Sequence, residues 1–129
     1  MTASPTPSAP DRRRPALLIL VRSDPHTQAP RVNEAIRVAA GLAAGQVGSV
    51  TIYLHEAAVL ALDPHGPWPA EEAVLRQAWS ILRDAQAPVR VQPGAPARHG
   101  LGETAAPFEE IDLSGLNRLL GQATHVLNF

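Results

Sequence analysis

The sequence predicts an α/β protein, a three-layer α/β/α sandwich around a mostly parallel sheet of about five strands. A continuous apolar run at residues 16–21 is typical of an interior strand that is covered on both faces. Segments with apolar residues at helical spacing alternate along the chain with short segments rich in β-branched residues. At 129 residues and 45% hydrophobic, the chain is long and apolar enough for one core, so we expect a single domain over residues 16–129.

The first half of the chain is predicted to form a βαβ unit. The run ALLILV at 16–21 is its first strand. From Pro30 onward apolar residues recur at helical spacing, and Gly45 is a suitable C-terminal cap for this helix. The β-branched segment VTIYL at 50–54 is the second strand. A right-handed helical crossover between the two strands makes them parallel.

The second half continues the alternation of helices and strands. The expected elements are a short helix or turn at 55–62, a helix at 69–85, a strand at 88–91, a helix beginning at Asp112 or Ser114 and ending at Gly121, and a strand at 124–129. The connection 94–107 has no periodicity, and long connections of this kind are usually functional or mobile. Trp79 lies on an apolar helix face and is expected in the core or at a subunit contact, whereas Trp68 lies between two prolines and suits an interface anchor.

Composition and charge exclude several classes of function. Residues 1–15 are mostly Ser, Thr, Pro and Ala before an arginine run, and are expected to be a disordered tail. A net charge of −1 argues against nucleic-acid or membrane-surface binding, since both require a positive field. The apolar run at 16–21 is shorter than the core of an export signal, so we expect a cytoplasmic protein without a membrane segment. With no cysteine, the chain has neither a disulfide nor a thiolate nucleophile.

Four segments in order carry a resemblance to a known family. They are ALLILVRSDP at 16–25 leading into an Ala-rich helix, VTIYL at 50–54, VRVQPGAPARHGL at 89–101 and ATHVLNF at 123–129. In this order they resemble the DsrE/DsrF-like family, small α/β proteins that include subunits of bacterial sulfur relays. The resemblance spans most of residues 16–129. It implies the fold described above and association into homo- or hetero-oligomers, often trimers or hexamers.

The chain departs from the family at the position that carries sulfur. In sulfur-carrying members a cysteine follows the strand that resembles 89–91, a few residues before a turn like Arg98-His99-Gly100, and that position falls at about Pro93 here. Proline has no nucleophile, so the resemblance does not extend to persulfide transfer. We therefore expect a non-catalytic binding or assembly module, a homo-oligomer such as a trimer or hexamer. A structural subunit paired with a cysteine-bearing paralogue is a further possibility.

Candidate ligand-binding residues follow the strands. Ligands of open α/β sheets bind outside the carboxyl ends of the strands, where three polar loops would converge in this chain. The residues in these loops are Arg22, Ser23, Asp24 and His26 after the first strand, His55 after the second, and Pro93, Gly94, Arg98 and His99 after the third. The alternative function is thus an enzyme or sensor that binds a small anionic ligand or a metal there. The same residues would otherwise only stabilise loops, for which Ser23 and Asp24 are suited.

A metal site would need His26, His55 and His99 to meet, with Asp24 or Glu56 as an additional ligand. No paired histidine spacing supports this arrangement, and scattered histidines are usually exposed or hydrogen-bonded. We predict neither a metal nor another cofactor.

Two sets of charged residues leave alternatives open. Arg22, Arg31 and Arg98 would form an anion site near the start of the first helix, or would simply be exposed and solubilising. The pairs 71–72 and 109–110 are both Glu-Glu and look like paired carboxylates. We expect both pairs in the first turns of helices, where negative charge is favourable.

Overall fold

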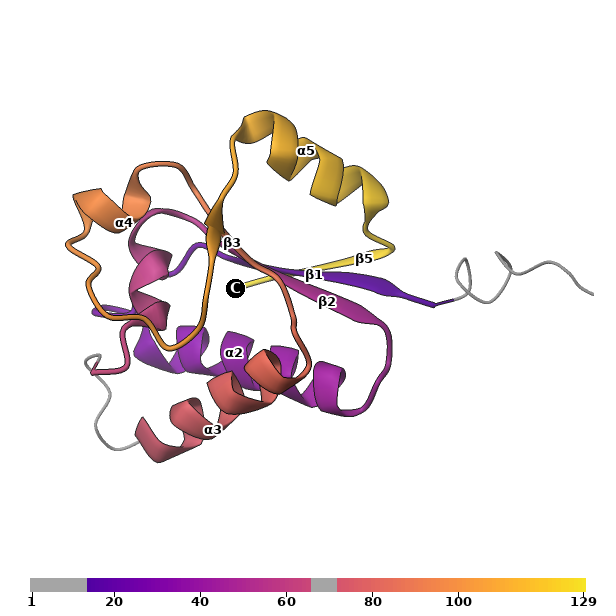
Figure 1. The fold of residues 1–129 in the computed structure, drawn as a ribbon, viewed down its shortest axis with the longest axis horizontal. Helices are drawn as coiled ribbons and strands as arrows, with labels where there is room; N and C mark the ends of the chain where they lie inside the picture. The colour runs from indigo at the N-terminus through magenta and orange to yellow at the C-terminus, as the bar shows by residue number, and fades with distance from the viewer. Residues whose placement is uncertain (1–13, 66–71) are drawn as a thin grey trace, which may run out of the picture.

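The computed structural model describes residues 14–65 and 72–129 and confirms the α/β sandwich (Figure 1). Its five strands form one sheet in the order β4-β3-β2-β1-β5, and every pairing is parallel. The elements in chain order are β1 Ala16–Val21, α2 Ala29–Ala44, β2 Ser49–Leu54, the 3-10 helix η1 Glu56–Leu62, α3 Glu72–Asp84, β3 Val89–Val91, α4 Ala95–Arg98, β4 Glu109–Glu110, α5 Leu113–Gln122 and β5 His125–Asn128. Helices α2 and α3 cover one face of the sheet, and α5 covers the other (Figure 1).

Three predictions fall wholly or mostly outside the described residues. They concern the disordered tail over 1–15, of which only Arg14 and Pro15 are described, the interface role of Trp68, and the placement of Glu71. No helix in the described ranges is long and apolar enough to cross a membrane.

Strand β1 is an interior strand of the sheet, as its continuous apolar sequence predicts. It pairs with β2 on one side and with β5 on the other, with Leu18 opposite both Thr51 and Val126. Leu18 and Ile19 point to opposite faces of the sheet and are 2% and 0% exposed. Burial on both faces is why this strand has no polar alternation.

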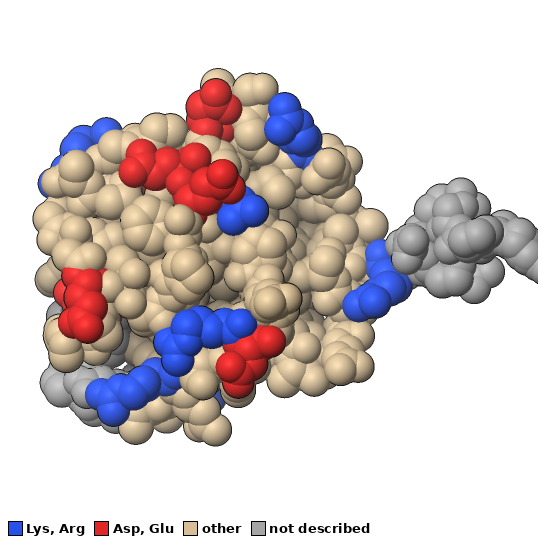
Figure 2. Space-filling model, in the orientation of Figure 1, with Lys and Arg blue, Asp and Glu red and all other residues tan. Residues whose placement is uncertain are grey.

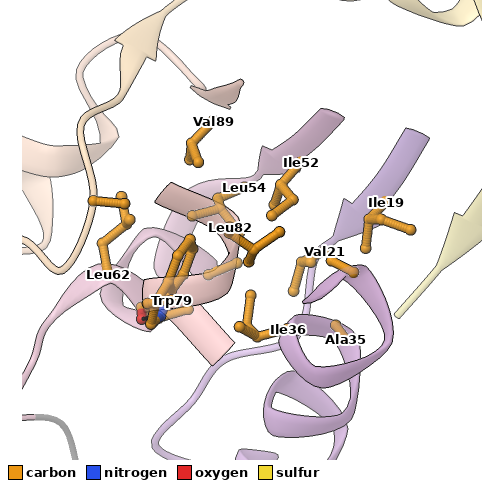
Figure 3. Packing of buried hydrophobic residues seen from close by; sticks show 14 of the residues in the cluster. Ile19, Val21, Ala35, Ile36, Ile52, Leu54, Leu62, Trp79, Leu82 and Val89 are labelled. Carbon is orange, nitrogen blue, oxygen red and sulfur yellow. Dashed lines mark hydrogen bonds between the residues drawn. The ribbon is translucent and has the colours of Figure 1, made fainter. Parts of the chain in front are cut away.

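The main core lies between the sheet and helices α2 and α3. Figure 3 shows side chains of β1, β2 and β3 meeting those of the two helices, among them Ile52, Ile36 and Leu82. Trp79 of α3 is 2% exposed in this layer, and its indole Nε1 donates a hydrogen bond to the Ala61 carbonyl at 3.1 Å. Trp79 therefore belongs to the core of the protomer, one of the two places that the sequence allowed.

The opposite face of the sheet is thinly covered. Its buried side chains are Leu18, Leu20 and Tyr53, which pack against partly buried residues such as Leu116 and Leu119. No residue of α5, all of which the structure describes, is buried. Three apolar side chains on this side are well exposed: Leu113 at 71%, Leu120 at 40% and Val126 at 38%. One face of the sheet thus has a full hydrophobic layer and the other has a partial one.

Acidic and basic side chains both occur on the face of the molecule shown in Figure 2.

The glutamate pair at 109–110, which the sequence placed in a helix, lies in a strand. Glu109 and Glu110 form strand β4 instead of a first helical turn, with Glu109 opposite Arg90 and Glu110 opposite Val91. The Arg90 Nε lies 3.3 Å from Glu109 Oε1, so an ion pair across the strands accompanies this pairing. The prediction of a helical turn at 109–110 was wrong.

The helix boundaries otherwise follow the predicted caps. Gly45 is the C-cap of α2. Of the two proposed caps of α5, Asp112 is the N-cap, with Oδ1 accepting a hydrogen bond from the Gly115 amide at 2.9 Å. Helix α5 runs one residue past Gly121, and the connection 94–107 contains the short helix α4.

Candidate functional site

Strand geometry brings Arg22 and His55 to one face of the sheet. Side chains alternate between faces, so Arg22 follows Leu20 onto the α5 side, and His55 follows Tyr53 onto the same side. The backbone remains paired beyond both strands. The Arg22 amide donates to the Phe129 carbonyl at 2.8 Å, and the His55 amide donates to the Val21 carbonyl at 2.9 Å.

A groove of about 500 Å³ lies between this face and α5. Its lining residues are Leu20, Arg22, Tyr53, His55, Leu116, Leu120, Val126 and Asn128. Within the described ranges, the side chains of Arg22, His55 and Asn128 have no hydrogen-bond or ion-pair partner. Small-molecule sites have this character: about 300–1,000 Å³ of mainly apolar lining with a few polar groups.

Next to the groove, Glu56 holds two of the predicted site residues together. Its Oε1 accepts hydrogen bonds from Arg98 Nε at 3.3 Å and Nη2 at 3.1 Å, and lies 3.3 Å from His99 Nε2. The hydrogen bond from Arg98 and then the one from His99 lower the pKa of the Glu56 carboxyl below its ordinary value. The Glu56 amide donates to Gln92 Oε1 at 3.0 Å, which ties η1 to the end of β3.

The Pro93-Gly94 turn sets up this cluster. Gly94 has a φ of +79°, a left-handed conformation that favours glycine, and its amide donates to Glu110 Oε1 at 2.9 Å. A Cβ at this position would lie 2.7 Å from Arg98 Nη1. The turn therefore leaves space for the Arg98 guanidinium. Pro93 itself is exposed.

The predicted loop residues after β1 have mainly local roles. Asp24 Oδ1 accepts a hydrogen bond from the His26 amide at 2.9 Å and lies 3.5 Å from His26 Nδ1. The Asp24 carbonyl accepts from the Gln28 amide at 2.7 Å, which closes the turn that leads into α2. Ser23 is buried, 6% exposed, and alternation places it on the face opposite Arg22. None of the three lines the groove.

The three histidines of the metal hypothesis do not converge. Among the described residues, no group of three His, Asp or Glu side chains is placed to hold a metal ion. His26 contacts Asp24 and His99 contacts Glu56, while His55 lines the groove.

The proposed site of three arginines is not formed either. Arg98 pairs with Glu56, and of the three only Arg22 lines the groove. The groove floor includes Tyr53, whose pKa is raised by burial and, to a smaller extent, by the Glu56 carboxylate.

Several residues of the site were not predicted. Glu56 was considered only as a metal ligand, and the lining side chains of α5 and β5 were not considered. For Leu20 and Tyr53, alternation along Leu18-Leu20-Arg22 and along Tyr53-His55 was the available signal, since it puts each of them on the same face as the polar residue that follows. The contribution of Asn128 depends on β5 lying beside β1, which local sequence patterns do not specify.

Comparison with known proteins gives a likeness in fold. No family model matches the sequence, and no curated protein matches it by sequence. The structure is similar to the crystal structure of the ychN protein from E. coli, with a TM-score of 0.72 and 21% sequence identity over 89% of this chain and 99% of that one. The chain therefore shares its fold with ychN.

Proposed function

We propose that the protein is a cytoplasmic, non-catalytic binding module of the DsrE/DsrF-like kind, which acts as a homo-oligomer and does not transfer sulfur through a thiol. The shared fold and the ordered sequence resemblance support the kinship. The observation that carries the proposal is the cluster beside Pro93, where one carboxylate, that of Glu56, engages both Arg98 and His99.

Sulfur carriage needs a thiolate, and a thiolate is stabilised by neighbouring positive charge. The chain has no cysteine. Pro93 marks the position of the cysteine in sulfur-carrying members, and the basic side chains beside it, Arg98 and His99, both contact the carboxylate of Glu56. The Gly94 amide donates to a second carboxylate, that of Glu110. The local field therefore favours an anion much less than two free basic side chains would.

Binding is supported by the groove beneath α5. Arg22, His55 and Asn128 have no described partner there, and their donors are available to a ligand. Self-association is supported by the thin cover of the same side of the sheet, where Leu113, which does not line the groove, is 71% exposed. A second copy is the partner that we favour, in a trimer or hexamer, over a cysteine-bearing paralogue.

The first experiment measures covalent sulfur on the purified protein. After incubation with a sulfurtransferase and a sulfur donor, intact mass spectrometry should show an unchanged mass, because no side chain can hold a persulfide. A cysteine-bearing relay protein in the same reaction is the positive control. A stable gain of one sulfur atom by this chain would overturn the proposal.

The second experiment introduces a thiol at Pro93, the position that corresponds to the cysteine of sulfur-carrying members. The thiol of a Pro93→Cys variant should react with a thiol-directed reagent at a rate close to that of Asn117→Cys, an exposed position in the middle of α5. Adding Glu56→Gln to Pro93→Cys should accelerate the reaction, since Arg98 and His99 are then released from a carboxylate. A fast reaction of Pro93→Cys alone would mean that the site is still arranged for thiol chemistry.

A further inference from the structure

We propose that the groove between α5 and the sheet binds an organic carboxylate that has an apolar body, with Arg22 as the partner of its carboxylate. The inference rests on the proposed binding function and adds the chemical class of the ligand. It is carried by the placement of Arg22, which has no partner among the described residues, at the polar end of a mainly apolar groove.

The apolar part of the groove has walls on both sides. Leu20, Tyr53 and Val126 contribute from three adjacent strands, and Leu116 and Leu120 contribute from successive turns of α5. Val126 and Leu120 remain 38% and 40% exposed, so the protein itself does not fill this space. A hydrocarbon or aromatic body placed here would remove apolar surface from water on both the ligand and the protein.

The polar groups lie at one end of the groove. Val126 is opposite Leu18, Asn128 is opposite Leu20, and Arg22 lies beyond the end of β1. Moving along the strands toward their carboxyl ends, the lining thus changes from apolar to polar. A ligand with a polar head and an apolar body matches this order, with its head beside Arg22 and His55.

The charge of Arg22 selects an anionic head, and a carboxylate is the simplest anion that an organic molecule carries. Arg22 is the one arginine among the described lining residues, and no described acidic side chain pairs with it. A guanidinium presents paired N–H donors that fit the two oxygens of a carboxylate. The nearby carboxylate of Glu56 already accepts hydrogen bonds from Arg98 and His99, so its partners are these two residues and not Arg22. His55 and Asn128 offer additional donors.

Three probes with the same hydrocarbon chain test the inference: octanoate, octanol and octyltrimethylammonium. Each is titrated into the full-length protein and followed by the amide NMR spectrum. Octanoate should bind saturably, with shifts concentrated at residues such as Leu116, Leu120 and Val126, and about tenfold more tightly than octanol. The cationic probe should bind most weakly. Equal affinity for octanoate and octanol, or shifts on the α2 side of the sheet, would overturn the inference.

Two matched variants identify the cation. Arg22→Gln should lower the affinity for octanoate about tenfold and leave the affinity for octanol unchanged. Arg118→Gln removes the same charge from an exposed position of α5 outside the groove and should change neither. An unchanged octanoate affinity in Arg22→Gln would refute the assignment. The amide NMR spectrum of each variant shows whether it is folded. The comparison of octanoate with octanol on the unmodified protein tests the preference for a carboxylate without any variant.

The outcome is distinguishable from failure of the proposed function. If a second copy fills the groove, octanoate will not bind while the protein still self-associates and takes up no sulfur. That result would reject the ligand and retain the binding module. Covalent sulfur uptake would reject the proposed function whatever octanoate does.

Discussion

Trp79 is the largest side chain of the main core, and its burial makes the protomer sensitive to truncation. It is 2% exposed, and its indole also supplies a hydrogen bond to the Ala61 carbonyl. We expect Trp79→Ala to lower the free energy of unfolding by about 3–5 kcal/mol. Urea denaturation followed by circular dichroism measures this loss.

A conservative variant separates packing from hydrogen bonding. Trp79→Phe keeps much of the apolar volume but leaves the Ala61 carbonyl without its donor, so we expect a smaller loss of about 1–3 kcal/mol. A negligible loss for Trp79→Ala would contradict the burial of Trp79 in the core of the protomer.

Glu56 makes the stability of the strand-end cluster depend on pH. Its folded pKa is lowered by Arg98 and His99 relative to the ordinary value of 4.5. A carboxyl with a lowered folded pKa stabilises the protein above its unfolded pKa, and this contribution is lost as pH falls through the folded pKa. We expect the stability difference between the unmodified protein and Glu56→Gln to be largest near neutral pH and to shrink below pH 4.5.

Urea denaturation of both proteins across this pH range provides the measurement. Glu34→Gln is the matched control, because it removes a carboxylate from the exposed face of α2, where no described side chain pairs with it. A Glu56→Gln protein that loses stability in parallel with the unmodified protein at every pH would show that the cluster contributes nothing to the pH dependence.

At the scale of elements, α5 depends on its cap more than a buried helix would. It has no buried residue, and Asp112 satisfies the amide of Gly115 at its start. We expect Asp112→Ala to cost about 1 kcal/mol and to accelerate amide exchange throughout α5, the wall of the groove. Ser114→Ala, inside the helix, should have little effect. Similar exchange in both variants would mean that the cap does not hold the helix.

Elements with a strong local pattern were predictable from the sequence. Strand β1 has an unbroken apolar run. Helix α2 has apolar residues at helical spacing and ends at a capping residue, Gly45. Strand β4 was not predictable, because two glutamates favour a helix start locally. Their pairing with Arg90 and Val91 arises only after residues distant in sequence come together.

The candidate site shows the same division. Alternation along β1 and β2 was sufficient to place Arg22 and His55 on one face. The pairing of Glu56 with Arg98 joins residues 42 positions apart, and the groove requires β5 to lie beside β1. Neither follows from local periodicity, since strand order is decided by packing of the whole sheet.

For the whole molecule, the unequal cover of the two sheet faces favours self-association. Leu113 is 71% exposed and lies on the same apolar stripe of α5 as Leu116 and Leu120, at positions i, i+3 and i+7. Burying such residues against a second copy is favourable. We expect Leu113→Glu to shift the protein toward monomer in sedimentation velocity, with little change in protomer stability.

Val47→Glu is the control for this substitution. Val47 is 46% exposed in the connection between α2 and β2, away from α5, and the same change there should leave the oligomer intact. If both variants dissociate, or neither does, the α5 side is not the specific interface.

Native mass spectrometry of the unmodified protein, purified from its own host, addresses binding, assembly and sulfur chemistry together. We expect a homo-oligomer whose subunits, once dissociated, have the mass of the unmodified chain without covalent sulfur. A monomer at every protein concentration, or subunits that carry covalently bound sulfur, would contradict the proposed function.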